Sequence, residues 1–116
     1  MAKRIRTLEA QIETIKQELA SLGDLHPGSL SKQYNVCGNP KCRCKEDPPR
    51  RHGPYYQVNF TRKGKSRTKF VKKPHVSMVK EHLKTYTRLR TLIDKWIELS
   101  IEICQLKMQE KDKQQN

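Results

Sequence analysis

Residues 37–56 read CGNPKCRCKEDPPRRHGPYY, and this stretch organises the rest of the chain. Four side chains of metal-binding type fall within sixteen residues: Cys37, Cys42, Cys44 and His52. Thiolates and an imidazole are ligands that a tetrahedral zinc ion takes. The prolines and glycines of the stretch prevent long regular secondary structure, so the loop needs an external cause of order. The sequence therefore predicts one structural Zn2+ site that orders this loop.

The predicted metal site is Cys-x4-Cys-x-Cys-x7-His, which differs from the two-residue spacing of common zinc fingers. Four protein ligands leave no open position for water, so no catalytic residue is assigned to the site. The identity of the fourth ligand stays open, because the chain has three further histidines: His26, His75 and His82. The alternative is four unrelated residues with free thiols. Cys104 has helical spacing and is expected to be a small core residue.

Positive charge is concentrated in the middle of the chain. The protein has 25 Lys and Arg against 12 Asp and Glu, which gives a formal net charge of +13. Residues 41–90 hold sixteen of these cations and three of the acids, whereas the two ends are close to neutral. A basic patch of this kind is typical of proteins that bind phosphates. A solvated, merely solubilising face is the alternative.

A β-hairpin is predicted over residues 54–73, because apolar and polar residues alternate there. The turn is expected to be the three residues Arg62-Lys63-Gly64, with Gly64 left-handed. This register pairs Phe60, Val58 and Tyr56 with Ser66, Thr68 and Phe70. Tyr55, Gln57, Asn59, Arg67 and Lys69 then share the polar face. A two-residue turn is rejected because it would move Arg67 and Lys69 to the apolar face.

The cations, amides and tyrosine of this region are the expected nucleic-acid contacts, with DNA favoured over RNA. Arg and Lys hold phosphates, amides read base edges, and tyrosine stacks on bases. The alternative is the charge-protected edge of a small sheet. The predicted contact residues are Lys41, Arg43, Lys45, Arg50, Arg51, Tyr55, Gln57, Asn59, Arg62, Lys63, Lys65, Arg67, Lys69, Lys72 and Lys73.

Two helices flank the hairpin in the prediction. The first has apolar residues at alternating three- and four-residue spacing over residues 3–22. The second runs over residues 75–110, and its apolar seam shifts phase between Tyr86 and Leu89, where the helix is expected to twist or change its packing partner. The predicted class is α+β, with a zinc-stapled hairpin between a coiled-coil-like helix and a long helix. The predicted segments are a helix at 1–23, a linker at 24–36 in which 29–34 could pair as a strand, the zinc loop and hairpin at 37–74, a helix at 75–110 and a frayed tail at 111–116.

The helical seams are expected to join copies of the chain into an oligomer, because the longer helix overhangs any partner within one chain. An intramolecular pair that closes over the hairpin is the alternative. The residues assigned to this interface are Ile5, Leu8, Ile12, Ile15, Leu19, Leu92, Trp96, Leu99, Ile103 and Leu106.

A cytoplasmic protein is expected, because the sequence begins without a secretory signal and has no apolar run long enough to span a membrane. Enzyme activity is not expected. A tyrosine nucleophile, Tyr55 or Tyr56 beside His52, is the enzymatic alternative. The middle segment lacks an acidic cluster for catalytic magnesium, because Glu46 and Asp47 stand next to each other with no further acid close by in the sequence.

The motifs Pro27-Gly28-Ser29-Leu30, Cys37-x4-Cys42-x-Cys44, His52-Gly53-Pro54-Tyr55-Tyr56 and Gly64-Lys65 resemble a family of short prokaryotic proteins of unknown function. The similarity covers roughly residues 27–100 and carries no activity. It implies a prokaryotic or mobile-element setting, beside transposition genes. The expected function is thus a zinc-binding, nucleic-acid-binding accessory protein. The alternative is a helical assembly adaptor whose basic hairpin docks on an acidic protein.

Overall fold

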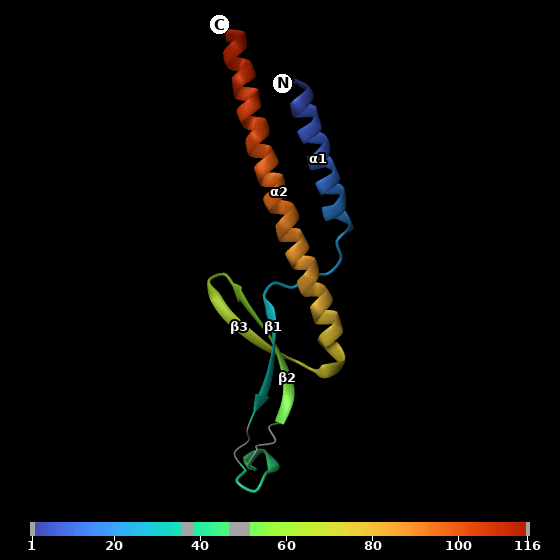
Figure 1. Ribbon diagram of the computed structural model, residues 1–116, viewed down its shortest axis with the longest axis vertical. Coiled ribbons are helices and arrows are strands. Elements are labelled where there is room, and N and C mark those ends of the chain that lie inside the picture. The colour runs from blue at the N-terminus through green and yellow to red at the C-terminus, as the bar shows by residue number, and fades with distance from the viewer. Residues whose placement is uncertain (1, 36–38, 47–51, 116) are drawn as a thin grey trace. The chain divides into compact units, whose positions relative to one another are not determined.

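The computed structural model describes residues 2–35, 39–46 and 52–115 (Figure 1). Its regular elements, in chain order, are α1 (Ala2–Ser21), β1 (Ser29–Asn35), a 3-10 turn (Arg43–Lys45), β2 (His52–Arg62), β3 (Lys65–Val71), a second 3-10 turn (Lys73–His75) and α2 (Val76–Gln115). The predicted α+β class is confirmed. The chain forms two compact units: one contains α1 and the part of α2 from Thr85 onward, and the other runs from Leu25 to Lys84.

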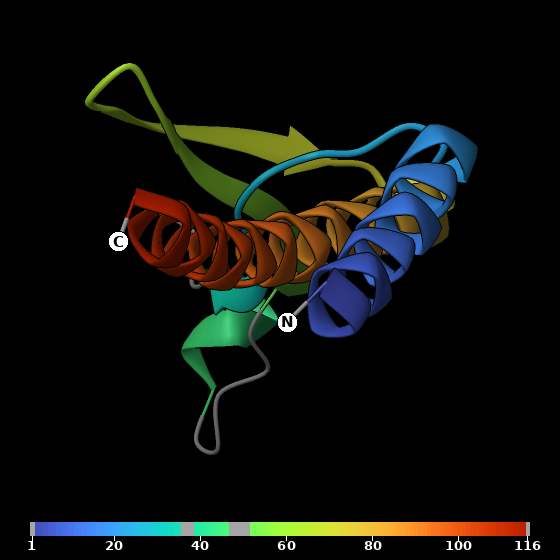
Figure 2. The ribbon, with the colours of Figure 1, turned by 90° about the horizontal axis from the view of Figure 1, so that it is seen from above.

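The first unit is an antiparallel pair of helices, α1 against the second part of α2 (Figures 1 and 2). Its core is formed by Ile5, Leu8 and Ile12 of α1 and Ile103 of α2, all buried, with Trp96, Leu99 and Leu106 packed against them. Removal of these side chains from water is the main force holding the pair together. Most of the seam assigned above to an oligomer interface is therefore filled within one chain, and oligomerisation stays a prediction.

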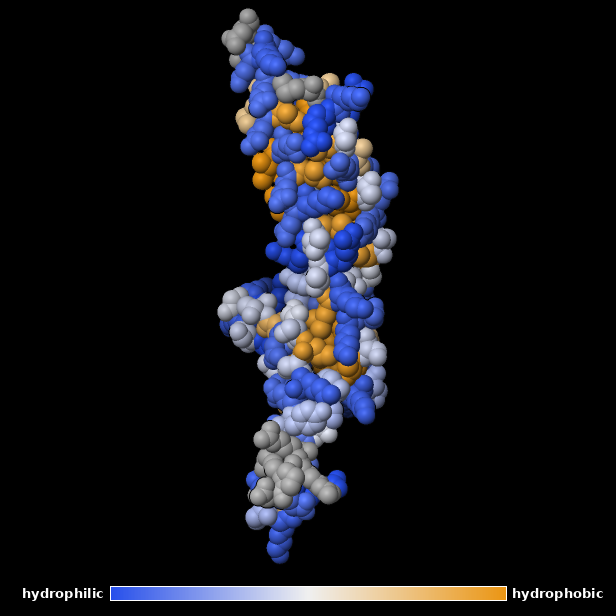
Figure 3. Space-filling model, viewed as in Figure 1, coloured by the Kyte–Doolittle hydropathy of each residue, from blue (hydrophilic) through white to orange (hydrophobic). Residues whose placement is uncertain are grey.

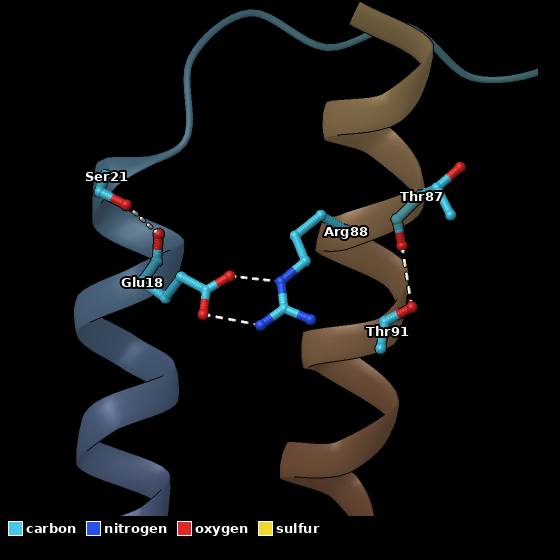
Figure 4. A network of polar contacts seen from close by, with 5 residues as sticks. All are labelled: Glu18, Ser21, Thr87, Arg88 and Thr91. Atoms are coloured by element: carbon cyan, nitrogen blue, oxygen red, sulfur yellow. Dashed lines mark hydrogen bonds and ion pairs between the residues drawn. The ribbon is translucent and has the colours of Figure 1, made fainter. Parts of the chain in front are cut away.

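Exposed ion pairs connect the two helices at both ends of the seam. Arg88 donates two hydrogen bonds to the Glu18 carboxylate, one of them 2.8 Å long (Figure 4). At the other end, Arg4 lies 3.1 Å from a carboxylate oxygen of Glu102. The hydrogen bonds from Arg88 lower the pKa of Glu18, so this pair stabilises the fold above the ordinary carboxyl pKa. Its contribution is lost as pH falls through the lowered value.

Helix α2 is continuous for 40 residues, but its two parts belong to different units. The boundary between Lys84 and Thr85 lies beside the phase shift that the sequence shows from Tyr86 to Leu89. The predicted change of packing partner therefore coincides with the change of unit. The helix runs to Gln115, beyond the predicted end at residue 110. Its last residues are mostly Gln, Lys, Glu and Asp, with no Gly or Pro to end it.

In the second unit, the described strands form one antiparallel sheet in the order β1-β2-β3. The register between β2 and β3 differs from the prediction by one residue. Phe60 pairs with Arg67, Val58 with Lys69, and Arg62 with Lys65, so the turn is the two residues Lys63-Gly64. Both have positive φ, 51° at Lys63 and 76° at Gly64. This is the twist that two-residue hairpins require, and it matches the strands better than the predicted bulged turn.

The register decides which side chains share a face of the sheet. Arg67 and Lys69 of β3 lie on the face of Val58 and Phe60, and Phe70 lies on the face of Gln57. The predicted polar face is therefore wrong in two respects: it loses both β3 cations and gains an aromatic residue. Val58, at the centre of the sheet, is 3% exposed, whereas Phe70 is 76% exposed.

The segment before β1 is tied to the sheet and to the start of α2 within the second unit. The His26 ring packs edge-on against Phe60, with ring centres 4.8 Å apart. The His26 backbone N–H donates to the carbonyl oxygen of His82 at 3.0 Å. These contacts hold the chain where β1 begins. Among the described residues, no helix combines the length and the apolar character needed to cross a membrane.

Replacing Leu8 with alanine is expected to lower the free energy of unfolding by about 2–5 kcal/mol. Leu8 is 1% exposed, so truncation leaves a cavity in the helix pair. Urea unfolding followed by circular dichroism measures the change. Gln17→Ala, at an exposed position of α1, is the control and is expected to change stability by less than about 0.5 kcal/mol. Equal losses in the two variants would contradict the packing described here.

Replacing Lys63 with asparagine is expected to raise the free energy of unfolding by up to about 1 kcal/mol, since asparagine adopts the left-handed conformation more readily than lysine. Lys65→Asn removes the same charge just after the turn and serves as the control. Thermal melting of both variants provides the measurement. In a three-residue turn Lys63 would have a negative φ, so an unchanged or lower stability of Lys63→Asn would argue against the two-residue turn.

Candidate metal centre and nucleic-acid interface

A compact turn presents the two described cysteines of the loop. The Lys41 backbone N–H donates to the side-chain oxygen of Asn39 at 3.0 Å, and the Cys42 N–H donates to the Asn39 carbonyl at 3.1 Å. The 3-10 turn Arg43–Lys45 follows, closed by a 2.9 Å hydrogen bond from Lys45 N–H to the Cys42 carbonyl. Cys44 is 1% exposed, which makes it one of the most buried side chains described.

His52 reaches the same place from the first residue of β2, where it pairs with Asn35 at the end of β1. Gly53, the next residue, has φ 135°, and a Cβ there would lie 2.8 Å from the Gln33 carbonyl oxygen. Only glycine fits this conformation and this close approach of the two strands. Gly53 thus allows β1 and β2 to close tightly beside His52, and the Gly53–Pro54 peptide bond is cis.

Cys42, Cys44 and His52 converge, with their ligand atoms all within 4.8 Å of one another. Nε2 of His52 lies 3.1 Å from Sγ of Cys42. In a tetrahedral zinc site, bond lengths of about 2.0–2.3 Å place ligand atoms roughly 3.3–3.8 Å apart. The three side chains are thus within small adjustments of a coordination shell, and they could hold a metal ion.

The remaining candidates for this site are placed differently. Cys37, the predicted fourth ligand, lies outside the described residues. His26 has its Nδ1 atom 2.6 Å from the Pro27 carbonyl oxygen and its ring on Phe60. His75 belongs to the second 3-10 turn and His82 to α2. Within the described part of the chain, the Cys/His group that brings metal-binding atoms together is the one with His52.

Basic residues alternate with the cysteines of the loop. Lys41, Arg43 and Lys45 are exposed, whereas Cys42 is half-buried and Cys44 is buried. This is the expected pattern, in which the sulfurs turn inward and the cations face solvent. Arg50 and Arg51, predicted to extend this positive surface, lie outside the described residues.

The hairpin of β2 and β3 carries the main group of cations. Arg62, Lys63 and Lys65 surround the turn, Arg67 and Lys69 follow along β3, and all five are exposed. The described ion pairs use other cations, namely Arg4, Lys84 and Arg88. In the part of the chain that the structure describes, no carboxylate neutralises the five hairpin cations. Lys72 and Lys73, also exposed, continue the series beyond β3.

The amide side chains predicted to read bases lie on the other face of the sheet. Asn59 donates to Ser31 Oγ at 3.1 Å and accepts from Thr68 Oγ1 at 2.9 Å, so its amide links all three strands. Gln57 and Tyr55 lie along the same face of β2. The described hydrogen bonds thus give Asn59 a structural role in the sheet, whereas Tyr55 is 42% exposed.

Two residues of this surface escaped the sequence prediction. Lys32 pairs with Tyr56 on the face of Lys69, and its ammonium lies 5.7 Å from the centre of the Tyr34 ring. A hydrogen bond with Tyr34 raises the pKa of Lys32, which keeps the charge in place. Phe70 was assigned to the apolar face. No signal in the sequence argued against that assignment, since Gly64 suits a three-residue turn as well as a two-residue one.

Comparison with known proteins gives a family but no activity. No curated protein and no solved structure matches the chain. The family model of a domain of unknown function (DUF6788) matches residues 5–81, which include most of α1, the three strands β1, β2 and β3, and the start of α2. The predicted resemblance to a family of unknown function agrees with this match, and the Cys signature of that prediction stays untested. Because the match covers more than half of the chain, the protein belongs to the DUF6788 family.

Proposed function

We propose that the protein is a small zinc-stabilised nucleic-acid-binding accessory protein, with DNA preferred over RNA. The observation that carries this proposal is the row of five exposed hairpin cations without a described carboxylate partner. Like charges gathered on one small sheet repel each other, so the arrangement weakens the fold unless an anion binds there. Phosphates supply that anion in a regularly spaced form, and binding releases their condensed counterions.

The metal in this proposal is zinc, held by Cys42, Cys44 and His52 with Cys37 as the fourth ligand. Sulfur and imidazole donors favour Zn2+ over Mg2+ or Ca2+, which prefer oxygen. A bound zinc ion would fix the loop to the ends of β1 and β2, where His52 pairs with Asn35. The ion would thereby hold Lys41, Arg43 and Lys45 in one orientation. A site of four protein ligands is structural, and we propose no enzyme activity.

The helix pair is proposed to join the protein to a larger assembly, as a homo-oligomer or in a complex that serves a prokaryotic mobile element. Its support is a second apolar stripe on α2, which the core with α1 does not use. Ile97, Ile101 and Met108 are each more than half exposed. Figure 3 shows hydrophobic residues gathered over the helix pair, whereas the hairpin tip at the left is mostly hydrophilic.

The same stripe favours the rival function, an assembly adaptor whose hairpin docks on an acidic protein. A hollow of about 460 Å³ follows the stripe, lined by Ile93, Trp96, Ile97, Ser100, Ile101 and Cys104. Apolar hollows of this kind are typical of helix-binding surfaces. In that case the hairpin cations would bind an acidic protein surface instead of nucleic acid, and this is how the two functions differ.

The protein is expected to bind one Zn2+ per chain. Losing a group that only hydrogen-bonds a metal ligand lowers metal affinity roughly 10–100-fold. Cys44→Ser removes a ligand itself and is expected to lower the affinity for Zn2+ by more than that. Metal analysis after dialysis, and the thiolate absorption of the Co2+-substituted protein, provide the measurement. Cys104→Ser is the matched control, because Cys104 lies in α2, far along the chain from the loop. Equal zinc content in Cys44→Ser and Cys104→Ser would contradict the proposed zinc site.

Charge reversal of the hairpin, Arg67→Glu with Lys69→Glu, is expected to abolish most nucleic-acid binding, because two phosphate contacts become repulsive. Fluorescence anisotropy with labelled DNA measures affinity over a range of salt concentrations. The wild-type logarithmic slope is expected to be about −0.7 to −0.9 per phosphate contacted. Lys107→Glu with Lys111→Glu makes the same change of charge on α2 and should leave the slope unchanged. A wild-type affinity that is independent of salt would refute the phosphate interface and leave the adaptor.

A further inference from the structure

Two exposed aromatic side chains lie together on one face of the sheet. Tyr55 and Phe70 are on the face of Gln57, because Gln57 pairs directly with Phe70 and lies two residues after Tyr55. Tyr55 is 42% exposed and Phe70 is 76% exposed. Both line a hollow of about 190 Å³ at this end of the sheet. The two side chains thus border the same hollow, and both are open to solvent.

Phe70 is an unusual residue for its position. It lies on β3, an edge strand whose residues from Lys65 to Phe70 are all exposed. An exposed edge is normally protected by charge, and a large apolar ring there promotes aggregation. The core of the second unit does not use the ring, since Val58 occupies the buried centre of the sheet from the other face. The ring is therefore available to a ligand.

Cations border the same hollow. Lys72 and Lys73 line it together with Pro54, Tyr55 and Phe70. The last described pair between the strands is Tyr56 with Val71, and Lys72 and Lys73 directly follow it in the chain. Two lysines thus border the hollow that both aromatic side chains line. Aromatic rings next to cations are complementary to a nucleotide, whose base stacks while its phosphate pairs with the charge.

We propose that Tyr55 and Phe70 form a stacking surface for unpaired bases, and that the ligand of this face is single-stranded nucleic acid. The inference rests on the proposed function and narrows its substrate class. Bases inside a duplex are stacked on each other and offer no free ring face, so this surface is of use only with a single strand, a loop or an end. Stacking accepts every base, so we expect little sequence preference.

The test compares a labelled fifteen-nucleotide single strand of mixed sequence with the same sequence as a duplex, by fluorescence anisotropy. Phe70→Ala is expected to weaken single-strand binding about 5- to 150-fold, the range for loss of one stacked base, and to leave duplex binding within about twofold. Phe70→Leu keeps an apolar side chain without a ring and should weaken binding similarly. Phe70→Trp should retain binding, and its new indole fluorescence should be quenched by the single strand.

The controls separate stacking from folding and from charge. Met78→Ala removes another exposed apolar side chain of the same unit and should change neither affinity. Melting temperatures should be alike for all Phe70 variants, since the ring is mostly exposed. If the wild type binds no nucleic acid, the proposed function and this inference fail together. If it binds but Phe70→Ala affects both ligands equally or neither, stacking is refuted while the basic interface stands.

Discussion

The pairing of β2 with β3 through Lys63 and Gly64 is the constraint on which the functional surface depends. Side chains alternate along a strand, so a shift of one residue exchanges the two faces. In the observed register Arg67 and Lys69 lie on the same face of the sheet as Val58 and Phe60. The register thereby places Phe70 on the opposite face, beside Gln57. In the proposed function, the cations bind phosphates and the exposed ring of Phe70 stacks on a base.

The second organising feature is the convergence of Cys42, Cys44 and His52 where β1 ends and β2 begins. Two of these side chains come from a short turn and one from a strand, so a metal held by them would join a loop to the sheet. Among its described residues the second unit has little apolar core of its own, with only Val58 and Cys44 buried. A domain of this size commonly relies on such a link for stability. The helix pair, by contrast, is held together by a buried apolar core of its own.

Periodicity was sufficient to predict both helices and the hairpin, because these patterns depend only on neighbouring residues. The Cys/His group could be predicted in the same way from residue type and crowding, although Cys37 lies outside the described residues. The strand register could not be predicted from the pattern, because Phe70 was expected to lie on an apolar face and is in fact exposed on the polar one. The seam of α1 posed a different difficulty: its partner within the chain, around Ile103, looks the same in sequence as a partner in another copy.

The conformation of Lys63 has a consequence for the hairpin tip. A lysine with φ 51° is in the left-handed region, which costs an ordinary residue about 1–2 kcal/mol and which asparagine or glycine occupies with less strain. Strained residues of this kind persist where the surrounding structure holds them, and they concentrate at binding sites. At this turn the chain accepts a poorer local conformation and keeps a full positive charge at the outermost point of the sheet.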